Sequence, residues 1–337
     1  MKAALARDTF GAVAALGFFC AAAQAQPVAD FYKGKSITFL VGSGAGASYD
    51  FYARTLAENM GRHIPGAPKI VVKTTGGQSG GRDVAESMSN SVAPDGLTIA
   101  MTQQTVVLHQ VLEPKFARYD ARRWYWLGNM APIRNMLLVW HTSKAQSVEQ
   151  AKSNEVAIGA TSTSSPTYIV PNILNRFAGT KFKIITGYKG VADLDLAMRR
   201  GEIEGRGASW LSAQLALATE IQEKKVRAIV FASRTRDPSA PDVPTMSEAM
   251  PDEKGRRVAN FLAAESDFGR SVFISGSVPE DRAKALRTAF EATMKDPEFL
   301  AMAAKLKLDI EPTSGDSLAA LTLDVVNAPA EIIELAR

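Results

Sequence analysis

Three segments of the chain carry small and hydroxyl-bearing residues in a pattern that suits the binding of a small anion. In each, a run typical of a β-strand ends in small or polar residues, and a helix-like pattern follows at once. The segments are Gly42 to Asp50, Thr161 to Thr167 and Tyr188 to Asp193. Helix N-termini present unpaired N–H groups and the positive end of the helix dipole. Three such turns meeting at one point would hold an anion without an arginine side chain. For the first segment, a tight strand–helix turn with no ligand is the structural alternative.

Catalytic groups are much less evident than these loops. The three histidines, His63, His109 and His141, are not spaced as metal ligands. The first glycine-rich loop departs from the dinucleotide pattern G-x-G-x-x-G at Ala47, and the next strand ends in Lys73 instead of an acid. We therefore expect no catalytic residue, no metal site and no cofactor. An α/β nucleotide- or phosphate-dependent enzyme is the less favoured alternative.

Two further features admit either a binding or a structural role. The aromatic run Trp124-Tyr125-Trp126 could stack against a ligand, although such runs more often pack in a core. Gln103 and Gln104 follow an expected strand, where their side-chain amides could reach a ligand or remain on the surface. The sequence leaves both questions open.

The composition argues against nucleic acid as a partner. The 337 residues carry a formal net charge of +4, with 22% charged and 46% hydrophobic residues. Basic residues are interspersed with acidic ones, whereas nucleic-acid-binding proteins usually cluster them. The chain has the composition of an ordinary globular protein of one large domain or two lobes.

The first 25 residues have the features of a cleavable signal peptide. Lys2 and Arg7 precede an apolar stretch, Phe10 to Ala22, that is too short to span a bilayer, and Ala23 to Ala25 supplies a small-x-small cleavage site. Cleavage would remove Cys20, the only cysteine, and with it any disulfide or thiol chemistry. We expect an exported, periplasmic protein.

Apolar runs alternate with helical patterns along most of the chain. This alternation predicts β-α-β units and an α/β fold. Strands are expected at 36–41, 69–73, 97–101, 136–141, 156–160, 182–186 and 226–232, with weaker ones at 258–261 and 271–275. Helices are expected at 50–63, 82–91, 168–178 and 191–200 and through most of the tail from Pro279. In the first helix, Phe51, Leu56 and Met60 are placed to face the sheet.

Several stretches in a fixed order resemble one family of receptors. They are "DFYKGKSITFLVGSGAGASYDFYARTLAENMGRHIPGAP", "TTGGQSGGRDVAE", "VAPDGLTIAM", "GYKGVADLDLAMRRGEIEG", "APDVPTMSEAM" and "MKDPEFLAMAAKLKLDIEPTSGD". Together they resemble the periplasmic solute receptors of tripartite tricarboxylate transporters, the Bug-type receptors, over nearly all of the mature chain. The chain departs from the family in its first loop, in the Gly-Gly-Gln-Ser-Gly-Gly of its second loop, and in the Thr/Ser-rich run at 161–165. These departures indicate a different ligand from that of better-known members.

The resemblance implies a type II periplasmic-binding-protein fold, in which two α/β lobes enclose a ligand cleft. Lobe I would comprise residues 26–130 and 251–337, and lobe II residues 131–250. The expected ligand is a small aliphatic or aromatic mono- or dicarboxylate, passed on to the permease subunits of a secondary transporter by a receptor that is a monomer. An exported receptor that serves a sensor kinase is the alternative within this class.

The ligand-binding residues expected from the loops and the resemblance all lie in or beside the small-residue turns. Asp50 is expected to cap its helix or brace its loop rather than contact an anion directly. The complete set is Ser43, Gly44, Ala45, Gly46, Ala47, Ser48, Asp50, Gly77, Ser79, Gln103, Thr161, Ser162, Thr163, Ser164, Ser165, Tyr188, Lys189, Gly190 and Asp193.

Overall fold

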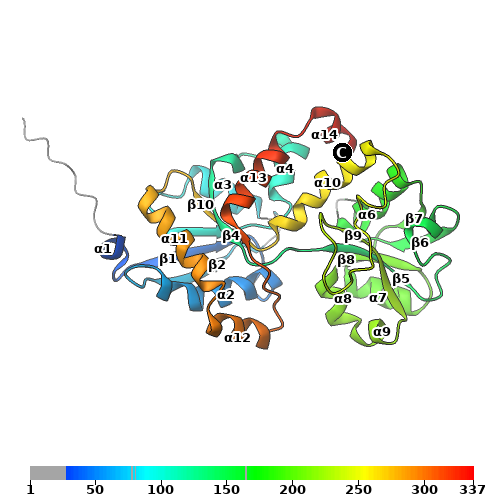
Figure 1. The fold of residues 1–337 in the computed structure, drawn as a ribbon, viewed down its shortest axis with the longest axis horizontal. Helices are drawn as coiled ribbons and strands as arrows, with labels where there is room; N and C mark the ends of the chain where they lie inside the picture. Colours follow the sequence, from blue (N-terminus) through cyan, green and yellow to red (C-terminus); the bar gives the residue numbers. More distant parts are fainter. Residues whose placement is uncertain (1–27, 77–78, 80, 164) are drawn as a thin grey trace, which may run out of the picture.

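A computed structural model describes residues 28–76, 79, 81–163 and 165–337, and these residues form two α/β lobes (Figure 1). Each lobe is built on its own sheet. The strands are β1 (Ser36–Val41), β2 (Lys69–Thr74), β3 (Thr98–Met101), β4 (Trp124–Asn129), β5 (Asn135–Trp140), β6 (Glu155–Gly159), β7 (Lys181–Ile185), β8 (Gly205–Ser209), β9 (Val226–Ala232), β10 (Ser271–Ser275) and β11 (Thr313–Ser314). The mixed architecture and the two lobes agree with a type II periplasmic-binding-protein fold. The predicted signal peptide lies outside the described residues.

The helices cover both sheets and join the lobes. They are α1 (Val28–Tyr32), α2 (Ser48–Met60), α3 (Arg82–Asn90), α4 (Val106–Leu112), α5 (Val148–Ala151), α6 (Pro166–Ile173), α7 (Val191–Arg199), α8 (Trp210–Ala216), α9 (Ala218–Gln222), α10 (Glu253–Phe268), α11 (Glu280–Thr293), α12 (Pro297–Lys305), α13 (Gly315–Val326) and α14 (Ala330–Ala336). Helix α10 packs on α13, α14 and α4 and also touches β9, so it lies at the junction of the lobes (Figure 1). Within the described residues, no helix is both long and apolar enough to cross a bilayer.

The sheet of lobe I has the strand order β11-β4-β10-β3-β1-β2. Strands β1, β2 and β3 are parallel, whereas β10 runs antiparallel to both β3 and β4. The first residues of β10 therefore lie at the same sheet edge as the carboxyl ends of β1 and β3. Open α/β sheets bind their ligands at this edge.

The sheet of lobe II has the order β7-β6-β8-β5-β9. Strands β6, β7 and β8 are parallel, and β5 runs antiparallel to its neighbours β8 and β9. The loops that follow β6 and β7 consequently emerge side by side at one edge of this sheet.

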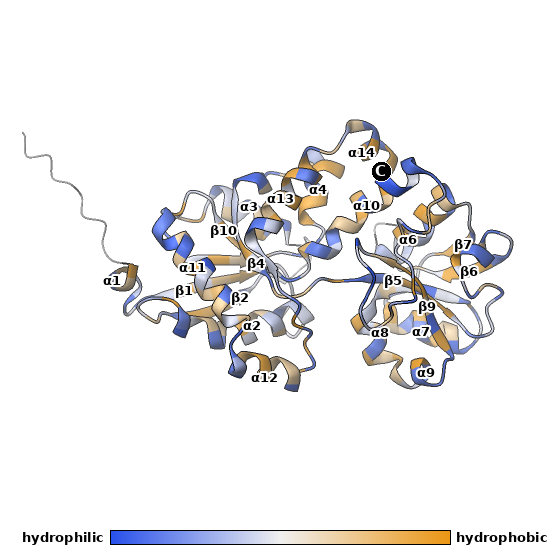
Figure 2. Cartoon of the chain, viewed as in Figure 1, coloured by the Kyte–Doolittle hydropathy of each residue, from blue (hydrophilic) through white to orange (hydrophobic). Residues whose placement is uncertain are grey.

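Hydrophobic residues concentrate in the strands and on the helix faces turned toward them (Figure 2). One buried cluster continues from lobe I into lobe II through α10, and it includes Trp126, Leu137, Phe261 and Ile229. Two further clusters fill the opposite faces of the two sheets separately. The shared cluster explains why the lobes pack together along one side and leave the loop-bearing side for a cleft.

The chain passes from the first sheet to the second after β4, and this segment contacts the turn before β10. The segment after β4 and the turn before β10 are joined by the bonds Met130 N–H to Arg270 O (3.3 Å) and Arg270 N–H to Ala131 O (3.0 Å). A Cβ on Gly269 would lie 2.0 Å from the carbonyl oxygen of Ala131, so only glycine permits this crossing. The contact fixes the position of Arg270 at the cleft edge of lobe I.

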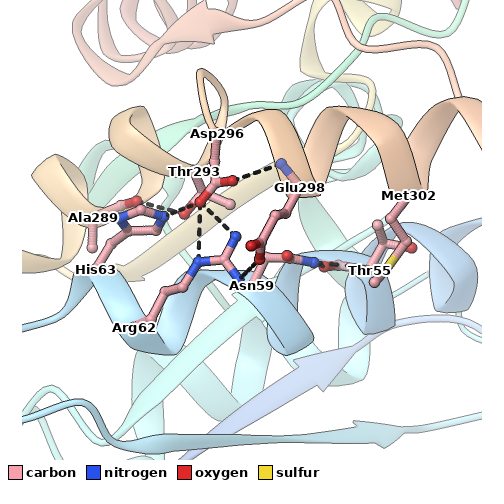
Figure 3. Close-up of polar contacts among 9 residues, drawn as sticks. All are labelled: Thr55, Asn59, Arg62, His63, Ala289, Thr293, Asp296, Glu298 and Met302. Carbon is pink, nitrogen blue, oxygen red and sulfur yellow. Dashed lines mark hydrogen bonds and ion pairs between the residues drawn. The ribbon is translucent and has the colours of Figure 1, made fainter.

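A cluster of charged side chains fastens α12 to the end of α2 (Figure 3). One oxygen of Asp296 accepts hydrogen bonds from Arg62 Nε (3.0 Å) and Nη2 (2.6 Å) and contacts His63 Nε2 (2.7 Å). The other oxygen accepts the N–H of Glu298 and so caps α12. The Arg62 guanidinium holds the pKa of Asp296 well below its usual range. These groups are used in structural contacts and lie at the opposite end of α2 from the loop at 42–47.

The structure corrects three predictions about elements. Helix α2 begins at Ser48, two residues earlier than expected, and Phe51 is 47% exposed instead of facing the sheet, where Tyr52 takes its place. The segment 258–261, expected as a weak strand, lies inside the 16-residue helix α10. Strand β8 was not predicted, because its sequence Gly-Arg-Gly-Ala-Ser lacks the usual β-branched residues.

Candidate functional site

The three loops at the cleft edge of lobe I touch through their backbones. A Cβ on Gly42 would lie 2.4 Å from Cα of Gly81, and a Cβ on Gly81 would lie 2.9 Å from the backbone nitrogen of Gln103. These glycines belong to the turns after β1 and β2, and Gln103 follows β3. The small residues therefore allow three loops to gather in a space that larger side chains would fill.

The loop from Gly42 to Ala47 uses part of its own hydrogen-bonding capacity. The N–H groups of Gly42, Ser43, Gly46 and Ala47 donate to acceptors within lobe I. Across the described residues, the N–H groups of Gly44, Ala45 and Ser48 have no such acceptor. Ala45 to Ser48 are solvent-exposed at the N-terminus of the 13-residue helix α2. This end of lobe I can therefore offer main-chain donors to an anion.

Asp50 braces this loop from the first turn of α2. Its carboxylate accepts the N–H of Gly46 (2.8 Å) and forms an ion pair with Arg54 (2.9 Å). The side chain of Arg54 and the Gly46 N–H outweigh the effect of burial and lower the pKa of Asp50. The N-cap position itself belongs to Ala47, which has no side-chain cap. The carboxylate is thus committed to the loop and is not presented to a ligand.

A polar network behind the loop joins α2, α4 and α10. The Tyr49 hydroxyl accepts the N–H of Gln104 (3.0 Å) and donates to Gln104 Oε1 (3.1 Å). Nearby, Glu265 accepts a hydrogen bond of 2.9 Å from Asn135 Nδ2 at the start of β5. Burial raises the pKa of Glu265 to about 7 and also raises the pKa of Tyr49. A half-buried carboxyl with a raised pKa thus connects the two lobes through its hydrogen bond with Asn135.

Replacement of Glu265 with glutamine should stabilise the protein at high pH. The folded state holds a proton on Glu265 up to about pH 7, whereas an unfolded glutamate releases it near pH 4.3. Wild-type stability from this group is therefore complete below about pH 4 and is lost as the pH rises toward 7. Glu265→Gln keeps an acceptor for Asn135 and should gain about 2–3 kcal/mol over wild type at pH 8, with no gain near pH 4. Urea unfolding at several pH values measures this; a gain that does not vary with pH would contradict it.

The loops of lobe II lie beside one another but satisfy more of their own donors. The N–H of Thr161 donates to Thr167 Oγ1 (3.0 Å), and the N–H of Ser165 donates to the carbonyl oxygen of Ser162. The Ser165 hydroxyl caps α6. The main-chain N–H groups of Thr161 and Ser165 are therefore already bonded. Any contact of these two residues with a ligand would be made by their hydroxyl groups.

The remaining predicted residues of lobe II lie in the next loop. The Tyr188 ring packs close to Gly159 at the end of β6. Gly190 is the N-cap of α7, and Lys189 and Asp193 are exposed. These four residues therefore share the loop-bearing edge of lobe II with Thr161, Ser162, Thr163 and Ser165, of which Ser162 and Thr163 are also exposed.

Two small pockets lie between the lobes. One, of about 60 Å³, is lined by the starts of α4 and α6, including Thr105, His109 and Pro166, and by Glu265. The other, of about 40 Å³, is lined from lobe I by Tyr52, Arg270 and Asp309, and from lobe II by residues that include Ser209 and Asp237. A larger groove of about 870 Å³ lies on lobe II and includes none of the predicted ligand residues. The interlobe pockets are therefore the relevant ones for the loops described above.

Other predicted residues have structural contacts. Ser79 bonds to Asp83 in α3, and Gln103 Nε2 approaches the carbonyl oxygen of Gly42 at 3.5 Å. Gly77 and Ser164 lie outside the described residues. In the aromatic run, Trp124 and Trp126 are buried and pack against Phe273, so these two rings belong to the core of lobe I.

Four residues at the cleft were not predicted as ligand-binding residues: Tyr49, Gln104, Glu265 and Arg270. Gln104 was considered with Gln103 as a residue whose amide could reach a ligand, but only Gln103 was placed in the expected binding set. Arg270 directly precedes β10, whereas the sequence pattern pointed only to residues that follow strands. A charged residue between Gly269 and the apolar run 271–275 was the available signal, because an antiparallel strand begins at the edge where parallel strands end.

Comparisons with known proteins agree with this architecture. A UPF0065 protein of Bordetella bronchiseptica is 26% identical over 258 residues, covering 73% of this chain and 71% of that protein. A TctC solute-binding protein from Polaromonas, solved without ligand, superimposes with a TM-score of 0.68 at 16% identity, covering 90% of this chain and 97% of that one.

Two further solved structures carry bound carboxylates. MatC from Rhodopseudomonas palustris, with bound malate, has a TM-score of 0.60 at 19% identity and covers 90% of this chain and 99% of its own. Another protein of R. palustris, with adipate, has a TM-score of 0.61 at 16% identity, and the superposition covers 90% of this chain and 97% of that one. At these identities the superpositions establish a shared fold.

The family assignment rests on the sequence match that covers most of the chain. Residues 52–336 match the family described as tripartite tricarboxylate transporter family receptor. The match includes the loops after β2 and β3, both lobes and the C-terminal helices. The chain therefore belongs to the TctC family of tripartite tricarboxylate transporter receptors.

Proposed function

We propose that this receptor captures a small carboxylate in the cleft between its lobes and delivers it to a tripartite tricarboxylate-type permease. The observation that carries the proposal is the exposed N-terminus of α2, where the N–H groups of Gly44, Ala45 and Ser48 have no acceptor among the described residues. Hydrogen bonds to a charged group contribute about 1.5–3 kcal/mol each. Three of them, with bridging waters and lobe II hydroxyls, would supply the roughly −8 kcal/mol of micromolar binding.

The bound ligands of structural neighbours support a carboxylate as the ligand class. One neighbour holds malate and another holds adipate, both of which are dicarboxylates. In this chain the Thr/Ser-rich run at 161–165 would then contact the other end of the ligand. The run's hydroxyl groups suit a ligand that carries its own polar substituents.

The proposed cycle depends on movement of two lobes, with lobe I formed by residues 26–130 and 251–337 and lobe II by residues 131–250. Ligand bound between them would stabilise a closed form by hinge motion. The segment between β4 and β5 is the natural pivot, because the chain passes there from one sheet to the other and the segment is held by the turn before β10. The closed receptor would dock on the permease in the periplasm, after export directed by residues 1–25.

Calorimetric titration of the mature chain with a panel of carboxylates tests this function. The panel contains aliphatic and aromatic mono- and dicarboxylates, with sugars and divalent cations as the comparison set. We expect at least one carboxylate to bind with a Kd of about 1 μM or lower. Heat from a sugar or a cation, with none from any carboxylate, would refute the ligand class. Native mass spectrometry of the freshly purified protein would identify a retained ligand directly.

A further inference from the structure

Arg270 is held rigidly at the cleft edge of lobe I. Its N–H donates to Asn129 Oδ1 (2.7 Å) and to the carbonyl oxygen of Ala131 (3.0 Å). Its carbonyl oxygen accepts the N–H of Met130, and the next residue begins β10. Because β10 runs antiparallel to β3, this position lies beside the loops that follow β1 and β3. These hydrogen bonds therefore hold the backbone of Arg270 in one position, from which its side chain extends toward these loops.

The side chain reaches the N-terminus of α2. Its Nη2 donates to the Ser48 hydroxyl at 3.0 Å, and its guanidinium carbon lies 4.1 Å from the ring centroid of Tyr49 and 5.0 Å from that of Tyr52. Arg270 is only 6% exposed. A positive charge is thus buried next to the positive end of a helix dipole, an arrangement that disfavours the empty site electrostatically.

This buried charge has no anionic partner in the part of the chain that the structure describes. Among the described residues Arg270 forms no ion pair, and its Nε and Nη1 are buried without a hydrogen-bond acceptor. The other buried arginine, Arg206, is paired with Asp195 at 2.6 Å. Glu265 is near Tyr49 but is bonded to Asn135. Attraction to the two tyrosine rings is weaker than an ion pair and leaves both nitrogens unsatisfied.

Arg270 lines a small pocket between the lobes. The pocket of about 40 Å³ is lined by Arg270, Tyr52 and Ser209, and also by the carboxylates of Asp309 and of Asp237, which pairs with Arg134. A water-sized group needs about 10–15 Å³ of such volume, so the pocket admits roughly three of them, or one carboxylate group. The other arginine of the pocket, Arg134, is already paired with Glu311 and Asp237. Arg270 is the cation of this pocket that retains free donors.

We propose that Arg270 is the charged anchor of the ligand, whose carboxylate pairs with the guanidinium when the site is occupied while it also meets the main-chain N–H groups at the start of α2. This rests on the proposed function and deepens it, because it predicts how the site separates an acid from its neutral amide. The planar fork of an arginine matches the two oxygens of a carboxylate. An amide has the same shape but no charge, and its NH₂ group would face these donors.

The test compares acid and amide binding in wild type and three variants. The probes are a dicarboxylate that binds wild type in the panel above and its monoamide and diamide. Arg270→Gln and Arg270→Lys alter the anchor. Arg287→Gln is the matched control, because Arg287 also stacks on a tyrosine, at 4.0 Å from the Tyr125 centroid, but donates to the carbonyl oxygen of Trp126 and to Asp316. Circular dichroism establishes that each variant is folded.

The expected results distinguish the role of Arg270 from the proposal that the receptor binds carboxylates. Wild type should bind the diacid at least tenfold more tightly than the diamide, and Arg270→Gln should lose at least thirtyfold in affinity for the diacid. The affinity of Arg270→Lys for the diacid should lie between those of wild type and Arg270→Gln. The affinity of Arg287→Gln should stay within threefold of wild type. If wild type binds no carboxylate, the proposed function itself fails.

Two results would overturn the anchor alone. The first is carboxylate binding by Arg270→Gln with wild-type affinity. The second is equal affinity of wild type for the diacid and its diamide, which is decisive even if Arg270→Gln does not fold.

Discussion

Asp195→Ala is expected to destabilise lobe II by about 3–5 kcal/mol, because it leaves the buried Arg206 charge without a partner. Arg206 in β8 is fully buried, and its Nε donates to Asp195 Oδ1 at 2.6 Å. Its Nη1 and Nη2 have no acceptor among the described residues. Burial already lowers the pKa of the Arg206 guanidinium, which shows how poorly the site tolerates the charge.

The double variant Asp195→Ala/Arg206→Met should recover most of this loss. Asp195 lies on α7 between the buried residues Leu194 and Met198, which belong to the apolar cluster of lobe II, so we expect a methionine that replaces its partner Arg206 to be buried among apolar side chains. Replacement of a buried ion pair by apolar residues is often neutral or stabilising, whereas removal of one partner is costly. Urea unfolding of the single and double variants measures the difference. A single variant that loses less than about 1 kcal/mol, or a double variant no more stable than the single one, would contradict this account.

Gly42→Ala should destabilise the protein and also weaken ligand binding. The added Cβ would lie 2.4 Å from Cα of Gly81, so the turns after β1 and β2 would have to separate. Because the clash is with a backbone atom, no side-chain rotation can relieve it. We therefore expect the free energy of unfolding to fall by about 1–3 kcal/mol. The same displacement would move the N–H groups of Gly44 and Ala45, so affinity for the carboxylate should fall roughly tenfold or more. Thermal unfolding and calorimetric titration on one preparation measure both effects.

Gly190→Ala is the matched control for stability. Gly190 has φ −171°, which any residue adopts, and a Cβ there would meet no atom within 4 Å. Its free energy of unfolding should change by less than about 0.5 kcal/mol. If Gly42→Ala were as stable as Gly190→Ala, the close approach of the two turns would not be a feature of the protein in solution.

The sequence predicted the parts of the fold whose patterns are local. Strand β1, the loop after it and helix α7 could be found because apolar runs, glycines and helical spacing follow one another there. Strand β8 has a buried arginine and two glycines, and only its neighbours β5 and β6 make it a strand. The segment 258–261 is apolar enough for a strand. It is helical because it lies inside the 16-residue helix α10, which Asp252 caps at its start.

The site was predictable only where it depends on main-chain loops. The small residues from Gly42 to Ser48 pointed to available N–H groups, and three of these groups are available. Which ones are available depends on Asp50, which takes the N–H of Gly46. Arg270 lies 222 positions from its partner Ser48, and it reaches the site because an antiparallel strand places it there. Pairing over such a distance cannot be read from local spacing.

A crystal structure of the mature receptor with its ligand tests the central claim most directly. The account predicts one ligand carboxylate between the lobes, within hydrogen-bond distance of the N–H groups of Gly44, Ala45 or Ser48. A ligand held by lobe II alone, or a cation bound between Asp237 and Asp309, would contradict it.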